Sequence, residues 1–113
     1  MIAFWHGRAV SENQRLAPGQ GRFCANESYQ AFKESLIWQI RPYAEQFPGP
    51  VAVRITMILN SRIDASNIIK PVLDALQAAG VVKNDKLVQK MQWTRENAKP
   101  KQDDWLCITV TEA

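Results

Sequence analysis

The stretch that decides the fold runs from Val51 to Asp85 and reads VAVRITMILNSRIDASNIIKPVLDALQAAGVVKND. In its first nine residues, Val51 to Leu59, every second side chain is large and apolar, which predicts a strand with one buried face. Residues 67–79 then carry apolar side chains at the spacing of a helix, and Gly80 can end that helix. Because a further apolar run over residues 87–94 predicts a second strand, the stretch indicates a parallel strand–helix–strand crossover.

The helix expected over residues 67–79 gathers its few polar groups on one side. At 100° per residue, one face carries Asn67, Lys70, Asp74 and Gln77. Asp64 comes just before this helix and Asp85 just after it, at the start of the next apolar run. We therefore expect both flanking acids to enter from the same end of the crossover, and to form a site there with Lys70.

Each of these residues also has a purely structural explanation. Lys70 and Asp74 are spaced as an ordinary i,i+4 surface pair, which contributes a few tenths of a kcal/mol. Asp64 suits a turn, and either Ser66 or Asn67 suits the N-cap of the helix. The combination favours a site, because two acids flank a helix whose only charged residues point one way.

This order of residues resembles the signature of RusA-type Holliday junction resolvases, which are small, phage-associated endodeoxyribonucleases. The matching positions are Asp64, Ser66, Asn67, Lys70, Asp74-Ala-Leu76, Gly80 and Asn84-Asp85. More loosely, Ser11-Glu-Asn13 resembles the family's N-terminal Ser-Asn element, and residues 29–38 resemble its first helix. Two positions depart from the pattern. Ser66 stands where the family usually has its second aspartate, and Asn84 where it often has the first of an Asp-Asp pair.

The resemblance implies a metal-dependent endonuclease that resolves four-way DNA junctions by paired symmetric nicks, in recombination and repair. It implies catalytic roles for Asp64, Lys70 and Asp85. The implied ligands of a magnesium ion, or alternatively manganese, are Asp64, Ser66, Asp74 and Asp85. The implied nucleic-acid-binding residues are Asn13, Arg15, Arg22, Arg62, Asn67, Lys70, Lys83 and Lys86. A homodimer would supply the two sites that two nicks require.

Two other functions fit the same residues. Ser66 replaces one of about three negative metal ligands, which favours a relative that binds junctions with little cleavage. The second is a small RNA- or protein-binding module, in which a solvated basic face is formed by Arg54, Lys83, Lys86 and Lys90. Junction-specific nicking would distinguish the nuclease from both.

The composition fits one soluble domain over residues 1–113. The chain is 46% hydrophobic and 22% charged, with a net charge of +3. Committing Asp64, Asp74 and Asp85 to a cation leaves fourteen basic against eight acidic residues, which suits a polyanionic partner. Cys24 and Cys107 lack metal-binding spacing, and a single histidine, His6, excludes histidine-rich zinc sites. With no expected signal peptide or membrane span, we expect a cytoplasmic protein.

The remaining elements complete an expected α+β fold, with a mixed sheet packed against two helices. We expect a short strand over residues 1–5 and a long basic loop over 7–25. A helix pattern starting at Asn26 or Ser28 runs to about Phe47, and Pro42 should kink or break it near Arg41. Residues 96–104 read as an exposed hairpin loop before a last strand over 105–111. Across that hairpin Trp93 and Trp105 would face each other, whereas Trp38 suits a dimer contact and Trp5 suits the core better than base stacking.

Overall fold

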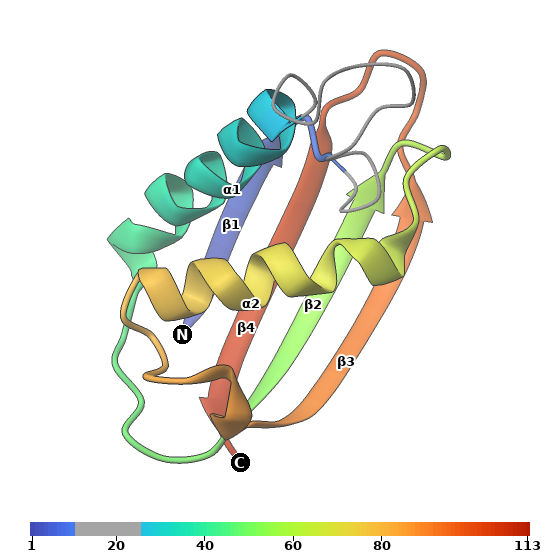
Figure 1. Ribbon diagram of the computed structural model, residues 1–113. Coiled ribbons are helices and arrows are strands. Elements are labelled where there is room, and N and C mark those ends of the chain that lie inside the picture. The colour runs from blue at the N-terminus through green and yellow to red at the C-terminus, as the bar shows by residue number, and fades with distance from the viewer. Residues whose placement is uncertain (11–25) are drawn as a thin grey trace.

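The computed structural model describes residues 1–10 and 26–113, which form a four-stranded sheet with two helices on one face (Figure 1). The elements are β1 Ile2–Gly7, α1 Asn26–Ile40, β2 Val51–Leu59, α2 Ile69–Ala78, β3 Val88–Asn97 and β4 Asp104–Glu112. Three short 3-10 helices connect them: η2 Arg41–Tyr43, η3 Ala65–Asn67 and η4 Asp85–Leu87. The predicted α+β class, with a mixed sheet on two helices, is confirmed. None of the helices described is long and apolar enough to cross a membrane.

The strands lie in the order β1-β4-β2-β3. β2 and β3 are parallel, with Val51 beside Val88 and Leu59 beside Asn97, so the predicted parallel crossover is confirmed. The predicted hairpin over residues 96–104 is wrong, because β4 pairs antiparallel with β1 and β2, and β2 separates it from β3. Trp93 therefore lies beside Ile55 and does not face a tryptophan of β4.

The core lies between the sheet and the two helices. The alternation in β2 is borne out, since every second side chain from Val51 to Leu59 is buried. The helices close the core with one stripe each, consisting of Tyr29, Phe32, Leu36 and Ile40 in α1 and of Val72, Ala75 and Leu76 in α2. Trp5 is 1% exposed and its Nε1 donates a hydrogen bond to Ser35 Oγ at 2.9 Å, which confirms the core position expected for it.

Both helices are shorter than their apolar patterns suggest. α1 ends at Ile40, so the pattern breaks near Arg41 as Pro42 predicts, and Phe47 instead forms an isolated bridge to Val82. α2 begins after Ile68, which makes no side-chain capping bond, so neither Ser66 nor Asn67 fills the N-cap position that its residue type suits. Gly80 has a φ of +81° and ends the helix as predicted.

Candidate functional site

Asp64 lies in the connection between β2 and α2, at the end of the sheet where β2 terminates (Figure 1). It precedes η3, its backbone is extended, and its side chain makes no capping hydrogen bond. Ser66 is exposed and Asn67 is half-buried within the same short turn. These three predicted site residues are therefore presented by one connection.

Asp85 lies at the other end of the sheet, which corrects the expectation that it enters beside Asp64. It begins η4, just before β3, and the start of β3 pairs with the start of β2 (Figure 1). Asp64, by contrast, follows the end of β2. In a parallel crossover the helix returns the chain to the opposite end of the sheet, so the two acids are separated by the length of β2. Its nine residues span about 30 Å at the usual rise of a strand.

Asp74 is occupied by two lysines. Its carboxylate lies 3.4 Å from Lys33 Nζ of α1 and 3.6 Å from Lys70 Nζ one helical turn away. It thus ties the two helices together and holds Lys70, whose side chain remains 59% exposed. Within residues 1–10 and 26–113, no three His, Cys, Asp or Glu side chains gather as a metal-binding group. One chain therefore does not assemble the predicted four-ligand site in its described part.

The connection that carries Asp64 is clamped by Arg95, a β3 residue that the sequence did not single out. Its guanidinium donates from Nη1 to the Ile63 carbonyl and from Nη2 to the Asn60 carbonyl at 3.0 Å. The same Nη2 also donates to Asn97 Oδ1 at 3.0 Å. An arginine fork that bonds two carbonyls of one loop fixes the path of that loop.

Asp104 holds the same connection from the other side. It is 4% exposed, the only buried charged residue among those described. Its Oδ1 accepts a hydrogen bond from the Asn60 amide at 2.7 Å, and its Oδ2 accepts one from the Ala9 amide at 2.8 Å. This carboxylate joins the end of β1 to the start of the loop that leads to Asp64. This role was not predicted from the sequence, because Asp104 is the last residue of a polar stretch that is typical of an exposed loop.

The predicted nucleic-acid-binding residues divide between the two ends of the sheet. Arg62 is exposed beside Asp64, and Lys70 extends from the first turn of α2. Asn67 lies half-buried between them, at the end of η3. Lys83 and Lys86 are exposed near Asp85 instead. The remaining three, Asn13, Arg15 and Arg22, lie outside the described residues.

Comparisons with known proteins agree with the resemblance read from the sequence. The family model described as Endodeoxyribonuclease RusA matches residues 7–103, a span that includes the β2–α2 connection, α2 and Asp85. The chain is also similar to the crossover junction endodeoxyribonuclease RusA of Aquifex aeolicus (strain VF5). The two are 30% identical over 97 residues, which cover 80% of this chain and 75% of the relative. The chain belongs to the endodeoxyribonuclease RusA family.

Proposed function

We propose that this protein is a structure-specific endonuclease that cleaves four-way DNA junctions by paired nicks, with the help of a divalent cation. The family supports the nuclease class, and the similar Aquifex aeolicus protein is named for cleavage of crossover junctions. The observation that carries the proposal is the setting of Asp64. Its carboxylate makes no hydrogen bond or ion pair with the residues described, while the loop beneath it is held rigidly by Arg95 and Asp104.

The chemistry of phosphodiester hydrolysis explains why such an acid matters. A divalent cation held by carboxylates, with open positions for water, supplies a nucleophile and neutralises charge on the phosphate. Asp64 and Asp85 are exposed acids able to serve as ligands, and Ser66, two residues after Asp64, offers a neutral hydroxyl oxygen. Asp74 is better suited to anchor Lys70, because two ammonium groups already flank its carboxylate.

A homodimer follows from the separation of the two acids. One chain cannot bring Asp64 and Asp85 to a single cation, because the length of β2 lies between them. A second copy, related by a two-fold axis that runs its strands antiparallel to the first, would put Asp85 of one copy at the end that carries Asp64 of the other. The same symmetry creates two equivalent sites, as two symmetric nicks in a four-way junction require.

Lys70 has a supporting role in this proposal. Its ammonium group is positioned by Asp74, yet it remains largely exposed at the start of α2, close in sequence to Asp64. A cation in that place is suited to contact the phosphate that is cleaved, or to stabilise the charge that develops on it. Asn67 lies in the turn between them, and on this proposal it contacts the same strand of DNA.

A second candidate function is junction binding with weak cleavage. Ser66 favours it, since a serine hydroxyl is a poorer ligand for a hard cation than the aspartate usual at this position of the family signature. A protein with this function would bind the same DNA and differ from an active nuclease only in its rate of cleavage.

The test is incubation of the protein with an end-labelled four-way junction and a linear duplex of matched sequence. Each is treated with magnesium, with manganese or with a chelator. We expect symmetric nicks in the junction alone and only with metal, whereas binding persists in the chelator because lysine and arginine contact phosphate directly. Tight junction binding with only trace nicking would favour the second candidate. Equal affinity for both DNAs without any nicking would reject both.

A further inference from the structure

A cleft of about 660 Å³ opens at the same end of the sheet as Asp64. It is lined by three segments that are distant in the sequence, 7–10 after β1, 60–63 after β2 and 101–104 before β4, together with Ser28 at the start of α1. The clamp formed by Asp104 holds two of these segments against each other. The cleft is therefore built on the same fixed framework as the connection that carries Asp64.

Each of the three segments contributes one exposed cation to the cleft. These are Arg8, Arg62 and Lys101. In the described part of the chain, none of the three side chains makes a hydrogen bond or an ion pair. Three unpaired cations around one hollow produce a local positive potential that attracts anions.

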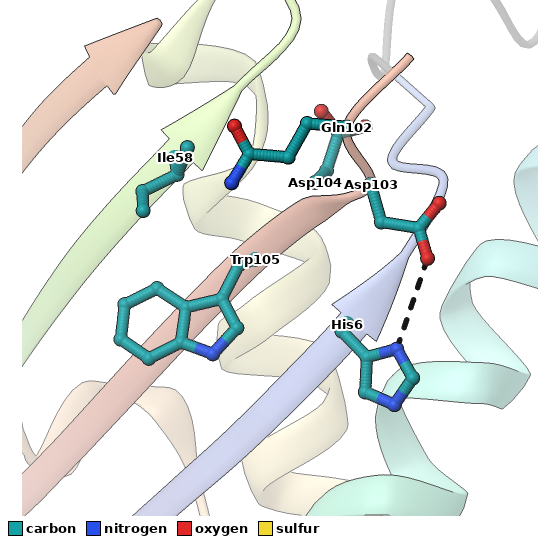
Figure 2. Close-up of a pocket in the computed structure, with 6 residues that line it drawn as sticks. All are labelled: His6, Ile58, Gln102, Asp103, Asp104 and Trp105. Atoms are coloured by element: carbon teal, nitrogen blue, oxygen red, sulfur yellow. Dashed lines mark ion pairs between the residues drawn. The ribbon is translucent and has the colours of Figure 1, made fainter. Parts of the chain in front are cut away.

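Two acids, Asp103 and Asp104, also line the cleft, so its cations exceed its carboxylates by one. The Asp104 carboxylate accepts the two backbone amides already described. The Asp103 side chain points toward the imidazole of His6, with Oδ2 3.9 Å from Nδ1, as Figure 2 shows for the neighbouring hollow. The Asp103 carboxylate is thus directed toward β1.

The backbone of Lys101 provides a second, independent observation indicating that this cleft binds a ligand. It has a φ of 66°, and no other residue except glycine has a positive φ in the part of the chain described. Its turn is locked, because the Gln102 amide donates to the Lys99 carbonyl at 3.0 Å and the Lys99 amide donates to Gln102 Oε1 at 2.8 Å. Glycine adopts this conformation without strain and lysine does not. A strained lysine where glycine would relax the turn indicates that the side chain itself is needed.

We propose that this cleft binds the sugar–phosphate backbone of DNA, with Arg8 and Lys101 contacting phosphates beside Arg62. The inference rests on the proposed function and deepens it, because it places a bound strand over the end of the sheet from which Asp64 projects. Contacts of this kind fix the position of the DNA and carry no sequence preference.

The decisive variant is Lys101→Gly, which removes the cation while relaxing the turn that presents it. Binding of the labelled junction and of the linear duplex is measured in a chelator between 50 and 200 mM salt. The slope of log affinity against log salt is negative, and loss of one phosphate contact should reduce its magnitude by about 0.9. The parent should therefore lose about 3.5-fold more affinity than the variant over that fourfold rise in salt. Thermal melting should show Lys101→Gly to be as stable as the parent, or more stable.

Two further variants keep the proposal falsifiable. Arg8→Gln should reduce the slope by the same amount, and the double variant by about twice as much. Lys99→Gln is the matched control, because Lys99 belongs to the same turn but does not line the cleft, and its slope should equal that of the parent. Unchanged slopes for both Lys101→Gly and Arg8→Gln, with junction cleavage intact, would overturn the cleft and leave the nuclease standing. Reduced slopes on both DNAs without cleavage by the parent would support the cleft and reject the nuclease.

Discussion

Replacing Asp104 with asparagine should destabilise the protein more than any other conservative change at the end of the sheet that carries Asp64. The side chain is buried, and each of its two oxygens accepts one backbone amide, from Ala9 at 2.8 Å and from Asn60 at 2.7 Å. Asparagine offers one acceptor and one donor. In either orientation, its NH₂ group faces a backbone N–H, so one amide is left buried without a partner.

The magnitude follows from those two bonds. A hydrogen bond to a charged group contributes about 1.5–3 kcal/mol, and an orphaned buried donor costs about 1–3 kcal/mol. We expect Asp104→Asn to lower the free energy of unfolding by about 3 kcal/mol. In a domain of this size that corresponds to a fall in Tm of about 12 °C. Because the lost bond frees one end of a clamp, cleavage should fall more than junction binding does.

The assay is urea unfolding followed by tryptophan fluorescence, with Asp103→Asn as the control. Asp103 is adjacent in sequence, but its side chain is 75% exposed, so its substitution should change stability by less than about 0.5 kcal/mol. Equal stability of the two variants would refute the assignment of Asp104 as a buried clamp. Hydrogen exchange at the Ala9 and Asn60 amides provides a local check, since one of them should lose protection in Asp104→Asn alone.

Three other substitutions test, in turn, whether Asp74 positions Lys70, whether Ser66 binds the metal, and whether the backbone at Gly80 requires glycine. Asp74→Asn breaks partly exposed ion pairs to Lys33 and Lys70, so it should cost less than about 1 kcal/mol. Its cleavage rate should fall at an unchanged half-maximal magnesium concentration, and a shifted concentration would make Asp74 a ligand. Ser66→Asp should lower the half-maximal magnesium concentration, whereas superimposable titrations would remove Ser66 from the metal site. Gly80→Ala meets no atom within 4 Å but has a φ of +81°, so a loss of about 1 kcal/mol is expected in thermal melts; an unchanged Tm would contradict this.

The sequence predicted the elements whose patterns are local. The alternation from Val51 to Leu59 reproduces the bounds of β2, because a strand buried on one face imposes a period of two. The end of α2 at Gly80 also follows from local chemistry. The end of α1 at Ile40 follows from local chemistry too, since Pro42 breaks the helix near Arg41 although the apolar spacing continues to Phe47.

What the sequence did not predict depends on which strands are neighbours. β4 inserts between β1 and β2, although its closest strand in the sequence is β3, and only this central place buries Asp104. In the sequence, Arg95 cannot be told from an ordinary exposed charge. Its role depends on the folded position of the loop over residues 60–63, whose carbonyls it binds. The error about Asp64 and Asp85 had a different cause. In two parallel strands, the end of β2 and the start of β3 lie at opposite ends of the sheet. The prediction used the spacing of the acids along the sequence and did not apply this geometric rule.

The shared site is tested most directly by mixing two inactive variants. Asp64→Asn and Asp85→Asn are each expected to bind junctions without cleaving them. They are then refolded together in equal amounts, so that mixed dimers form. If each site combines Asp64 of one copy with Asp85 of the other, every mixed dimer has one intact site, and the mixture should recover about a quarter of the parental nicking, as single nicks without full resolution. If both acids act within one chain, every site in the mixture lacks one acid, and a mixture that stays inactive would contradict the account.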